Sequence, residues 1–350
     1  MTTDLAPFLL APDDTVDAAA LRLRENAVGF GVVVDDDRRV LGTVADGAIR
    51  RAALAGSAFD APVTTVMSAK PIVAGRDAGD DEVLELLTSY RVRAVPVVEG
   101  DTLLGLRTLD EFPQHRAPAP TAVIMAGGRG QRLRPLTDKV PKPLLRIGPS
   151  AILERIITSL AGAGVEDVQL AVNYKANEFE RRLGDGQQLG VKLRYVRERE
   201  PLGTAGALSL LPELPRGPIL VTNGDLVTTL DFARLFAYHW HHGGAITIAG
   251  VEYLSHIPYG VLRTVEHHLL EIEEKPERRD FCSAGIYVLE PEVLRFVPPG
   301  GRRDMPELVA DVLAEGFPVH VFPVLEKWFD IGSPAEFERV LMQFATGESE

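Results

Sequence analysis

From Thr121 onward, apolar strand patterns alternate with amphipathic helix patterns, and no other feature restricts the fold as strongly. Residues 121–128 read as a buried strand that runs into glycines, and residues 150–164 carry isoleucine and leucine at helical spacing before a glycine. Further strands and helices follow, up to the strand pattern at 218–225. Strands separated by helices predict an α/β fold with a Rossmann-like, mixed but mostly parallel sheet and helices on both faces.

The first third of the chain contains an internal repeat. Residues 18–55 and 81–112 each run as a helix, an apolar strand, a turn and a further segment, and Gly42 and Gly105 hold matching positions 63 residues apart. Two copies that each expose an apolar face should stack into one module, because neither can bury that face alone. We therefore expect a smaller α/β domain ahead of the larger one.

A segment rich in proline and alanine separates the two parts. The run Arg116–Pro120 alternates alanine with proline, which can continue neither a helix nor a sheet ladder. We place the domain boundary there. This gives a first domain over 1–115, a linker over 116–120 and a second domain over 121–350.

The charge and cysteine content exclude several classes of protein. The 350 residues include 37 Lys and Arg against 50 Asp and Glu, and the net charge of −13 argues against broad binding to nucleic acid or anionic membranes. The single cysteine, Cys282, excludes an internal disulfide and cysteine-rich zinc sites, and we expect it to be a small buried apolar residue. No secretory signal or membrane span is predicted, so the expected location is the cytoplasm.

One stretch of this acidic protein is strongly basic. Residues 129–146 hold six basic residues and one acidic residue, directly after the glycines that end the first strand. The glycines allow a tight turn whose backbone N–H groups can face an anion, and prolines on both sides of Lys142 restrict its backbone. No P-loop Lys-Ser or Lys-Thr follows, and Leu133 stands where a Rossmann fingerprint has its third glycine. The interpretation is a phosphate-binding clamp.

Residues 126–147, AGGRGQRLRPLTDKVPKPLLRI, resemble the signature of the nucleoside-diphosphate-sugar pyrophosphorylases, the sugar-1-phosphate nucleotidyltransferases. The family pattern is G-G-x-G-[ST]-R-L-x-P-L-T-x-x-x-P-K-P, and the departure is Gln131, where the family has a small hydroxyl residue. Later motifs follow in the family's order across nearly all of 121–350. The resemblance implies transfer of a nucleotidyl group from an NTP to a sugar 1-phosphate, with release of pyrophosphate.

Two aspartates match the metal-binding positions of that family. Asp225 ends the strand pattern in VTNGDLV, where an unpaired carboxylate would be costly, and Asp330 stands in EKWFDIGSP, which resembles the family's W-x-D-x-G motif. The resemblance implies that both residues bind Mg²⁺. Two carboxylates with phosphate oxygens and waters suit this ion, because it keeps several waters and needs few protein ligands.

The resemblance also assigns the other site residues, through LGTAG at 202–206, EEKP at 273–276 and the SAGIYVL run, in which Ser283 replaces a commoner Asn. The implied catalytic residues are Arg132, Lys142, Asp225, Lys275 and Asp330. The implied nucleotide-binding residues are Ala126, Gly127, Gly128, Gly130, Gln131, Asn173, Gly203 and Thr204. The implied sugar-phosphate-binding residues are Glu198, Gly260, Glu274, Lys275 and Ser283.

The repeated N-terminal segment resembles a CBS-domain pair, a common sensor of adenosyl nucleotides. Of the family's G-[IV]-V-T-x-x-D pattern, the second copy keeps Thr108 and has Glu111 at the acidic position, whereas the first copy has Ala45 and Ala48. The missing polar groups favour a packing or dimerising module. An adenosyl nucleotide held by Thr108 and Glu111 is the alternative. Because CBS pairs usually associate, we expect a homodimer.

The later motifs look most like the mannose-1-phosphate guanylyltransferase branch, which favours GTP as the nucleotide. UTP, dTTP, ATP and CTP are alternatives, as is a sugar-like cyclitol 1-phosphate as the acceptor. No general base is required, since a phosphate monoester with a second pKa of about 6 is largely dianionic at neutral pH. A rival from another class is a nucleotide sensor whose transferase domain binds without catalysis, although the intact set of charged site residues argues against it.

Overall fold

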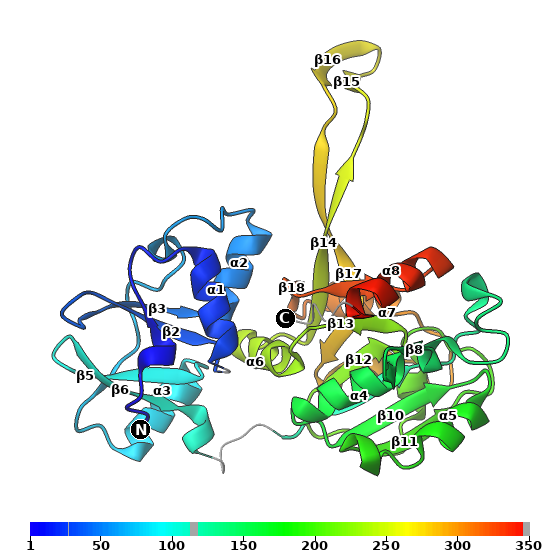
Figure 1. The fold of residues 1–350 in the computed structure, drawn as a ribbon, viewed down its shortest axis with the longest axis horizontal. Coiled ribbons are helices and arrows are strands. Elements are labelled where there is room, and N and C mark those ends of the chain that lie inside the picture. The colour runs from blue at the N-terminus through cyan, green and yellow to red at the C-terminus, as the bar shows by residue number, and fades with distance from the viewer. Residues whose placement is uncertain (27, 113–117, 346–350) are drawn as a thin grey trace.

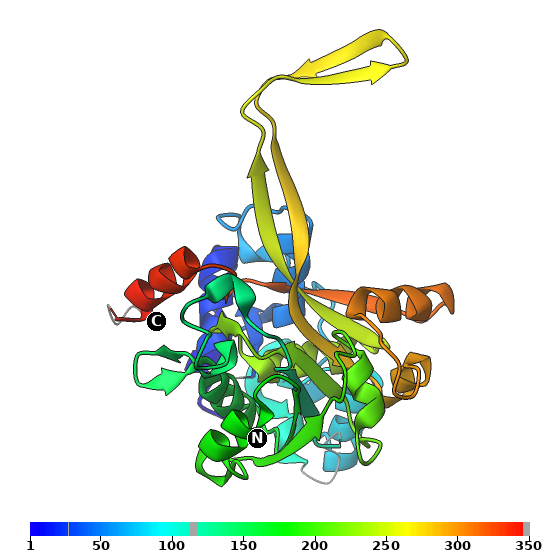
Figure 2. The same ribbon diagram turned by 90° about the vertical axis from the view of Figure 1, so that its right-hand side faces the viewer.

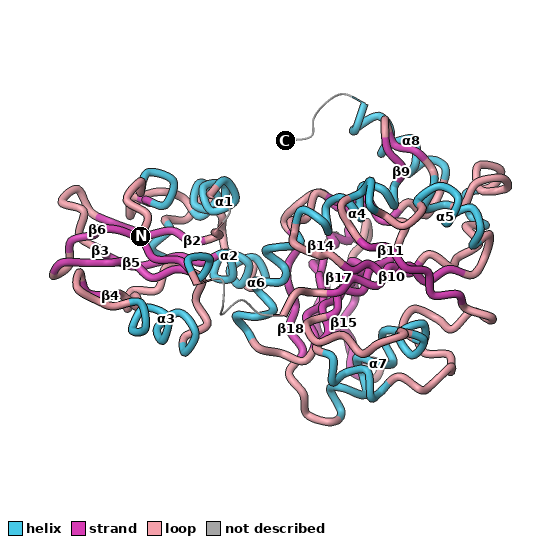
Figure 3. The backbone as a smooth tube through the Cα atoms, turned by 90° about the horizontal axis from the view of Figure 1, so that it is seen from below, coloured by secondary structure: helices cyan, strands magenta, loops and turns pink. Residues whose placement is uncertain are grey.

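The computed structural model describes residues 1–26, 28–112 and 118–345 (Figure 1). Of the expected linker over 116–120, residues 116 and 117 lie outside the described residues. A smaller α/β module precedes this segment and a larger one follows it. Figure 3 shows the two modules side by side, with helices of both at their junction.

The N-terminal module contains two three-stranded sheets built on one plan. In each sheet a short strand pairs parallel with a longer one, which pairs antiparallel with a third. The internal repeat expected from the sequence is confirmed, and Val32 and Leu106 from the two copies share one buried cluster. The strands are β1 (Leu9–Leu10), β2 (Phe30–Val34), β3 (Val40–Ala45), β4 (Ala74–Gly75), β5 (Ala94–Glu99) and β6 (Thr102–Thr108), and the helices are α1 (Val16–Glu25), α2 (Asp46–Leu54) and α3 (Asp80–Ser89).

Gly42 and Gly105 hold equivalent places in the two copies. In both ladders the register shifts just beyond the pair that contains the glycine. A Cβ atom at Gly42 would lie 2.7 Å from the carbonyl oxygen of Ser68, and one at Gly105 would lie 2.8 Å from the sulfur of Met1. Both distances are shorter than van der Waals contact. The backbone contact requires glycine at position 42, whereas at position 105 the flexible Met1 side chain could move aside.

The larger module is built on a seven-stranded sheet with the order β11-β10-β7-β12-β17-β14-β18. Strand β17 runs antiparallel to both of its neighbours, and the other neighbouring pairs are parallel. The predicted mixed, mostly parallel sheet is therefore confirmed. Its strands are β7 (Thr121–Met125), β10 (Asp167–Val172), β11 (Lys192–Arg197), β12 (Ile219–Asn223), β14 (Ile246–His256), β17 (Glu277–Leu289) and β18 (Val319–Val324).

Helices cover both faces of this sheet. Successive side chains of a strand point to opposite faces, so neighbouring residues of one strand pack against different helices. Along β7, Ala122 and Ile124 belong to one buried cluster, and Val123 belongs to another. The first cluster includes residues of α4 (Ile152–Gly162), α5 (Ala176–Leu183), α6 (Phe232–His242) and α8 (Pro334–Ala345), and the second includes residues of α7 (Met305–Ala314).

A long two-stranded arm leaves the sheet between its fifth and sixth strands. Strands β14 and β17 stay paired far beyond the sheet, as far as His256 opposite Glu277. The hairpin of β15 (Val261–Val265) and β16 (His268–Glu273) forms the tip, which Figure 2 shows standing clear of the rest of the molecule. Two further pairs are β8 (Arg146–Ile147) with β9 (Ser150–Ala151) and β13 (Leu226–Thr228) with β19 (Trp328–Asp330).

Two buried arginines join the modules. Arg50 of α2 is 1% exposed and donates to the Pro323 carbonyl oxygen at 2.6 Å and to Glu326 at 2.8 Å, both in the larger module. Arg234 of α6 is 5% exposed and donates to Asp46 of α2 at 2.9 Å. Asp46 also accepts from Arg50 at 2.6 Å, so one carboxylate links both guanidinium groups. Buried charges of this kind persist only when they are paired.

Cys282 is exposed, which contradicts the expectation of a buried residue: it lies on β17 opposite Val251, where the strand leaves the sheet and begins the arm. Among the described residues, no helix is both long and apolar enough to cross a bilayer.

Replacing Arg50 with alanine is expected to lower the free energy of unfolding by about 3 kcal/mol, because it leaves the Glu326 carboxylate and the Pro323 carbonyl without their buried donor and removes one of the two guanidinium partners of Asp46. Urea denaturation followed by circular dichroism measures the change. Arg24→Ala, at an exposed position of α1, is the matched control and should change stability by less than about 0.5 kcal/mol. Equal stability of the two variants would show that Arg50 does not join the modules.

Candidate active site

The glycine-rich loop and several polar side chains meet at the carboxyl edge of the parallel strands. Strands β7, β10 and β12 are neighbours and run in the same direction. The glycine loop follows β7, Asn173 follows β10, and Asp225 follows β12. Because the carboxyl ends of parallel strands lie at one edge of a sheet, the three groups lie at the same edge. The glycine loop and Asp225 line one cleft, whereas Asn173 lines a neighbouring hollow with Lys139 and Lys175.

Lys142 lies between the two aspartates that the sequence singled out. Its Nζ atom is 2.5 Å from Oδ2 of Asp225 and 3.7 Å from Oδ1 of Asp330. The aspartates, 105 positions apart in sequence, are brought together by the antiparallel pair β13–β19, in which Leu226 lies opposite Asp330. The lysine side chain is 7% exposed, and the aspartates are 33% and 49% exposed. An ammonium group can be buried here because two carboxylates balance its charge.

The donor set at this point fits a divalent cation. Two carboxylates converge on one positive charge, and the cleft beside them is open to phosphate oxygens and water. Mg²⁺ binds in this way, through one or two carboxylates together with substrate phosphates. Among the described residues no group of three or more His, Cys, Asp or Glu side chains forms a closed cage, as a fully protein-ligated metal would need. Asp225 and Asp330 are therefore the residues that would hold a metal.

The glycine loop lines one side of the cleft with backbone. Gly130 has a φ of +59°, in the left-handed region, and its carbonyl oxygen accepts a 2.8 Å hydrogen bond from the Thr137 hydroxyl. A Cβ atom at Gly130 would press against Thr137 and Lys142 at 3.1–3.2 Å. Glycine at this position therefore lets the loop fold tightly over Lys142. The exposed Arg132 follows this turn. Its guanidinium lies close to Gly332, which is two residues from Asp330.

Glu198 and the segment Leu202–Thr204 form the facing side. Oε1 of Glu198 accepts a hydrogen bond from the Leu202 backbone N–H at 3.1 Å. Gly203 has a φ of +82°, and a Cβ atom there would lie 2.5 Å from the Arg303 carbonyl oxygen. Asp304 accepts from the Thr204 backbone N–H at 3.1 Å, so the segment is fixed against the start of α7. Sequence reasoning missed Asp304, whose helix-capping position gave no sign of this contact.

Burial raises the pKa of the Glu198 carboxyl above its ordinary value, and the hydrogen bond from Leu202 opposes this shift. The other oxygen, Oε2, lies 2.6 Å from the point where a Cβ atom at Gly127 would stand. Glycine at 127 thus leaves room for a half-buried carboxyl in the cleft. Such a group can accept hydrogen bonds from a neutral hydroxyl-rich ligand more readily than it can tolerate a phosphate.

The Asn173 side chain joins two strand ends. Its amide Nδ2 donates to the Glu198 carbonyl oxygen at 2.8 Å, which ties the end of β10 to the end of β11. Asn223, at the end of β12, lines the cleft, although sequence reasoning assigned it no role. The strand-end position in VTNGD could have indicated it.

The cleft is lined by Met125, Ala126, Gly127, Gly128, Arg129, Gly130, Gln131, Arg132, Leu133, Lys142, Pro143, Glu198, Pro201, Leu202, Gly203, Thr204, Asn223, Asp225, Ile331 and Gly332.

Four residues assigned to the sugar phosphate are not brought to this cleft. Gly260, Glu274 and Lys275 lie on the arm, at the joint between the β14–β17 ladder and the tip. Ser283 lies at the root of the arm, where its hydroxyl is 2.8 Å from the Tyr287 hydroxyl. Among the described residues, none that lines the cleft belongs to 246–289.

Comparison with known proteins identifies the family of each module. The nucleotidyl transferase family profile matches residues 121–347, and the CBS domain profile matches residues 1–55 and 63–109. The chain belongs to the nucleotidyl transferase family. It carries a CBS-domain pair ahead of the transferase domain. Members of this transferase family generally use a divalent metal.

Curated relatives share the transferase region. The chain is 34% identical over 225 residues to a mannose-1-phosphate guanylyltransferase of Mycobacterium tuberculosis, and the match covers 62% of each chain. It is 36% identical over 227 residues to a mannose-1-phosphate guanyltransferase of Neurospora crassa, again over 62% of each chain. The chain thus spans less than two thirds of the length of these relatives.

Solved structures show the same transferase fold. A Bacillus anthracis protein described as a glucose-1-phosphate thymidylyltransferase, solved with sucrose, is 22% identical with a TM-score of 0.53. The match covers 65% of this chain and 95% of that one. HddC of Yersinia pseudotuberculosis is 27% identical with a TM-score of 0.50, over 64% of this chain and 99% of that one.

In the CBS pair, the two candidate ligand residues have partners within the protein. The Glu111 carboxylate accepts from the Thr108 backbone N–H at 3.0 Å, from Arg107 at 2.7 Å and from the N-terminal ammonium at 2.8 Å. Thr108 in turn caps the short helical turn Leu109–Glu111. An adenosyl nucleotide at these two residues stays a prediction from the sequence.

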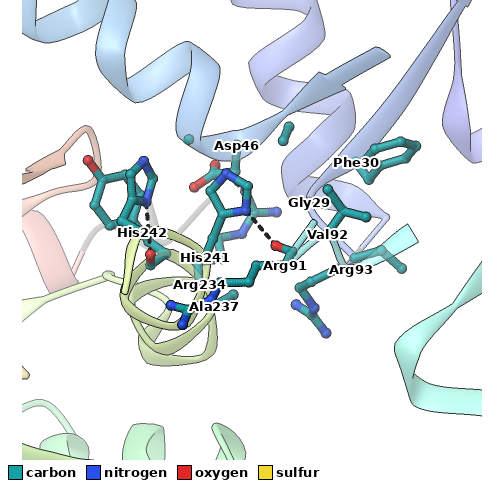
Figure 4. A pocket seen from close by; sticks show the side chains of 14 residues that line it. Gly29, Phe30, Asp46, Arg91, Val92, Arg93, Arg234, Ala237, His241 and His242 are labelled. Atoms are coloured by element: carbon teal, nitrogen blue, oxygen red, sulfur yellow. Dashed lines mark hydrogen bonds and ion pairs between the residues drawn. The ribbon is translucent and has the colours of Figure 1, made fainter. Parts of the chain in front are cut away.

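A second cavity lies between the CBS pair and α6 of the transferase domain (Figure 4). Its lining includes Asp46, Arg91 and Arg93 from the CBS pair and Arg234 and His241 from α6. Nδ1 of His241 lies 2.5 Å from the Arg91 carbonyl oxygen, which closes one side. Thr108 and Glu111 do not line this cavity.

The raised pKa of Glu198 predicts a specific dependence of stability on pH. Because the folded protein binds the Glu198 proton more tightly than the unfolded chain, this residue makes stability fall as pH rises from about 4.5 through the raised pKa. Glu198→Gln should remove that loss, so its stability relative to wild type should increase over this interval and then level off. Urea denaturation from pH 4 to 8 measures it. Glu200→Gln, at an exposed neighbouring position, should show no such increase.

Proposed function

We propose that this protein transfers a nucleotidyl group from an NTP, with GTP favoured, to a sugar 1-phosphate, releasing pyrophosphate. The observation that carries the proposal is the convergence of Lys142, Asp225 and Asp330 beside a glycine loop at the carboxyl edge of the sheet. A buried cation, two carboxylates and a glycine-rich backbone that phosphate can approach closely are what a triphosphate with its metal requires.

The chemical difficulty of this reaction is repulsion between two phosphates. An oxygen of the sugar 1-phosphate forms a bond to the α-phosphorus, and the bond from that phosphorus to the oxygen bridging to the β-phosphate breaks. In the proposal, Lys142 reduces the negative charge around the α-phosphate, and Arg132 at the cleft mouth holds the departing pyrophosphate. Mg²⁺ held by Asp225 and Asp330 would supply further charge neutralisation. The acceptor is already largely dianionic, so no side chain needs to remove a proton.

The preference for GTP is supported by the relatives. The two curated relatives described above are named as guanylyltransferases that act on mannose 1-phosphate. In the proposal, the half-buried Glu198 faces the sugar, because a carboxyl with a raised pKa pairs better with hydroxyl groups than with phosphate. UTP, dTTP, ATP and CTP, and a cyclitol 1-phosphate as acceptor, are the alternatives to be tested.

A matrix assay tests the proposed reaction. The purified protein with Mg²⁺ is incubated with each of the five NTPs and with mannose 1-phosphate, glucose 1-phosphate and a cyclitol 1-phosphate, and pyrophosphate release is measured. We expect the highest rate with GTP and a hexose 1-phosphate, and loss of the rate with EDTA. Binding of nucleotide without pyrophosphate release from any pair would instead support a non-catalytic sensor.

Lys142→Ala and Asp225→Ala are each expected to reduce turnover by a factor on the order of 10²–10⁴, as is typical when a charge partner of the transition state is lost. Steady-state pyrophosphate release with the preferred substrate pair measures the effect. Lys139→Ala removes an exposed cation of the same basic stretch and should retain turnover within about threefold. Near-normal turnover in folded Lys142→Ala or Asp225→Ala protein would refute the assignment.

A further inference from the structure

Asn223 places an unused amide group in the cleft. It is the last residue of β12, it is half-buried, and it lines the cleft. Its carbonyl oxygen accepts a hydrogen bond from the Thr222 hydroxyl at 3.2 Å, which involves only the backbone of Asn223. Within the described part of the chain, neither Nδ2 nor Oδ1 of Asn223 has a hydrogen-bond partner. Both ends of the amide are therefore available to a ligand.

The neighbouring strand is shaped to make room for this amide. Thr222 pairs with Ile286 in the β12–β17 ladder, so the next residues along, Asn223 and Gly285, are neighbours. A Cβ atom at Gly285 would lie 2.6 Å from Nδ2 of Asn223 and 3.2 Å from its Cγ atom. Gly285 also has a φ of +71°, in the left-handed region that favours glycine. Glycine at this position thus keeps open the space that the amide occupies.

The cleft has two parts that differ in charge. Arg129 and Arg132 line one part, which suits phosphate groups. Glu198 and Asn223 line the other, and none of the described residues that line this second part is an arginine. An uncharged portion of a substrate is therefore expected there, beside the phosphates and not on them.

An amide is well suited to bind a hydroxyl group. Nδ2 donates hydrogen bonds and Oδ1 accepts them, so one asparagine can satisfy both the oxygen and the proton of a hydroxyl. The amide is also neutral, so it does not repel a phosphate nearby. The Thr204 hydroxyl, in the same part of the cleft, already accepts from the Met305 backbone N–H at 2.7 Å.

We propose that the Asn223 amide binds a hydroxyl group of a substrate sugar and so contributes to the choice of substrate. The hydroxyl belongs either to the hexose of the acceptor or to the ribose of the NTP, which offer the same chemistry. This role rests on the proposed function, in which both sugars are attached to phosphates that react beside Asp225. Asn223 precedes Asp225 by two residues, which places the amide next to the reacting groups.

Replacement of the amide by an apolar side chain of similar size tests the contact. Asn223→Leu should lower kcat/KM by about 10-fold to 100-fold, because the hydroxyl loses its partner. The loss should appear in the KM of the substrate that carries the hydroxyl, and the KM of the other substrate should change less than about twofold. Gln188→Leu removes an exposed amide outside the cleft and should leave both KM values unchanged. Asn223→Ala gives the same comparison without the branched side chain of leucine.

Deoxygenated substrates identify the hydroxyl. The assay uses the preferred NTP and hexose 1-phosphate, together with the singly deoxygenated forms of each. With the form that lacks the bound hydroxyl, wild type and Asn223→Leu should have the same kcat/KM, because the substitution then removes no hydrogen bond. With the other forms the difference between the two proteins should persist. A form of the NTP that abolishes the difference assigns the contact to the ribose, and a form of the hexose assigns it to the acceptor.

Stability distinguishes this role from a structural one. The amide has no partner within the described residues, so Asn223→Leu should unfold at the urea concentration of wild type or at a higher one. Wild-type kinetics in the folded variants would overturn the inference. A loss of the same size with every deoxygenated form, or a clear drop in the stability of both variants, would also overturn it. In these cases the proposed function stands, whereas a wild type that releases no pyrophosphate from any substrate pair would remove the proposed function and this role with it.

Discussion

The ammonium group of Lys142 between Asp225 and Asp330 is the interaction on which the active edge of this protein depends. A lysine that is 7% exposed needs compensating carboxylates, and two aspartates this close need a cation between them. The pairing of Lys142 with the two aspartates connects the loop after β7 with β13 and β19. These three segments are far apart in the sequence. In the proposed reaction, a metal held by the two aspartates would balance their charge and leave the Lys142 ammonium to face the α-phosphate.

A second set of buried charges fixes the CBS pair to the transferase domain. Arg50 and Arg234 share Asp46, and Arg50 reaches the backbone and Glu326 next to β18. The helix that carries Arg234 begins seven residues after Asp225. A single stretch of chain, from Asp225 in the cleft to the end of α6, therefore connects the cleft with the junction between the domains. Helix α6 contacts the CBS pair on one side and the core of the sheet on the other.

Local patterns predicted the fold well, and three charged residues that the sequence singled out, Lys142, Asp225 and Asp330, lie together in the structure. The alternation after Thr121 predicts the sheet because strand and helix periodicities are local properties of the sequence, and the equivalent places of Gly42 and Gly105 follow from their matching positions in the repeat. Burial of single residues was harder to predict. Cys282 is apolar enough for a core but is exposed, because β17 extends past the sheet and its neighbours no longer cover it.

The sequence by itself determined the fold class, the repeat, and the residue types that a phosphate site needs, since these depend on spacing within short segments. Only the tertiary structure decided which of those residues meet. It brought Lys142, Asp225 and Asp330 together, because strand pairing closes gaps of many residues. It also placed Glu274 and Lys275 on an arm outside the cleft, because the β14–β17 ladder continues where the other strands stop. Such distances depend on the length and direction of paired strands, which no single motif records.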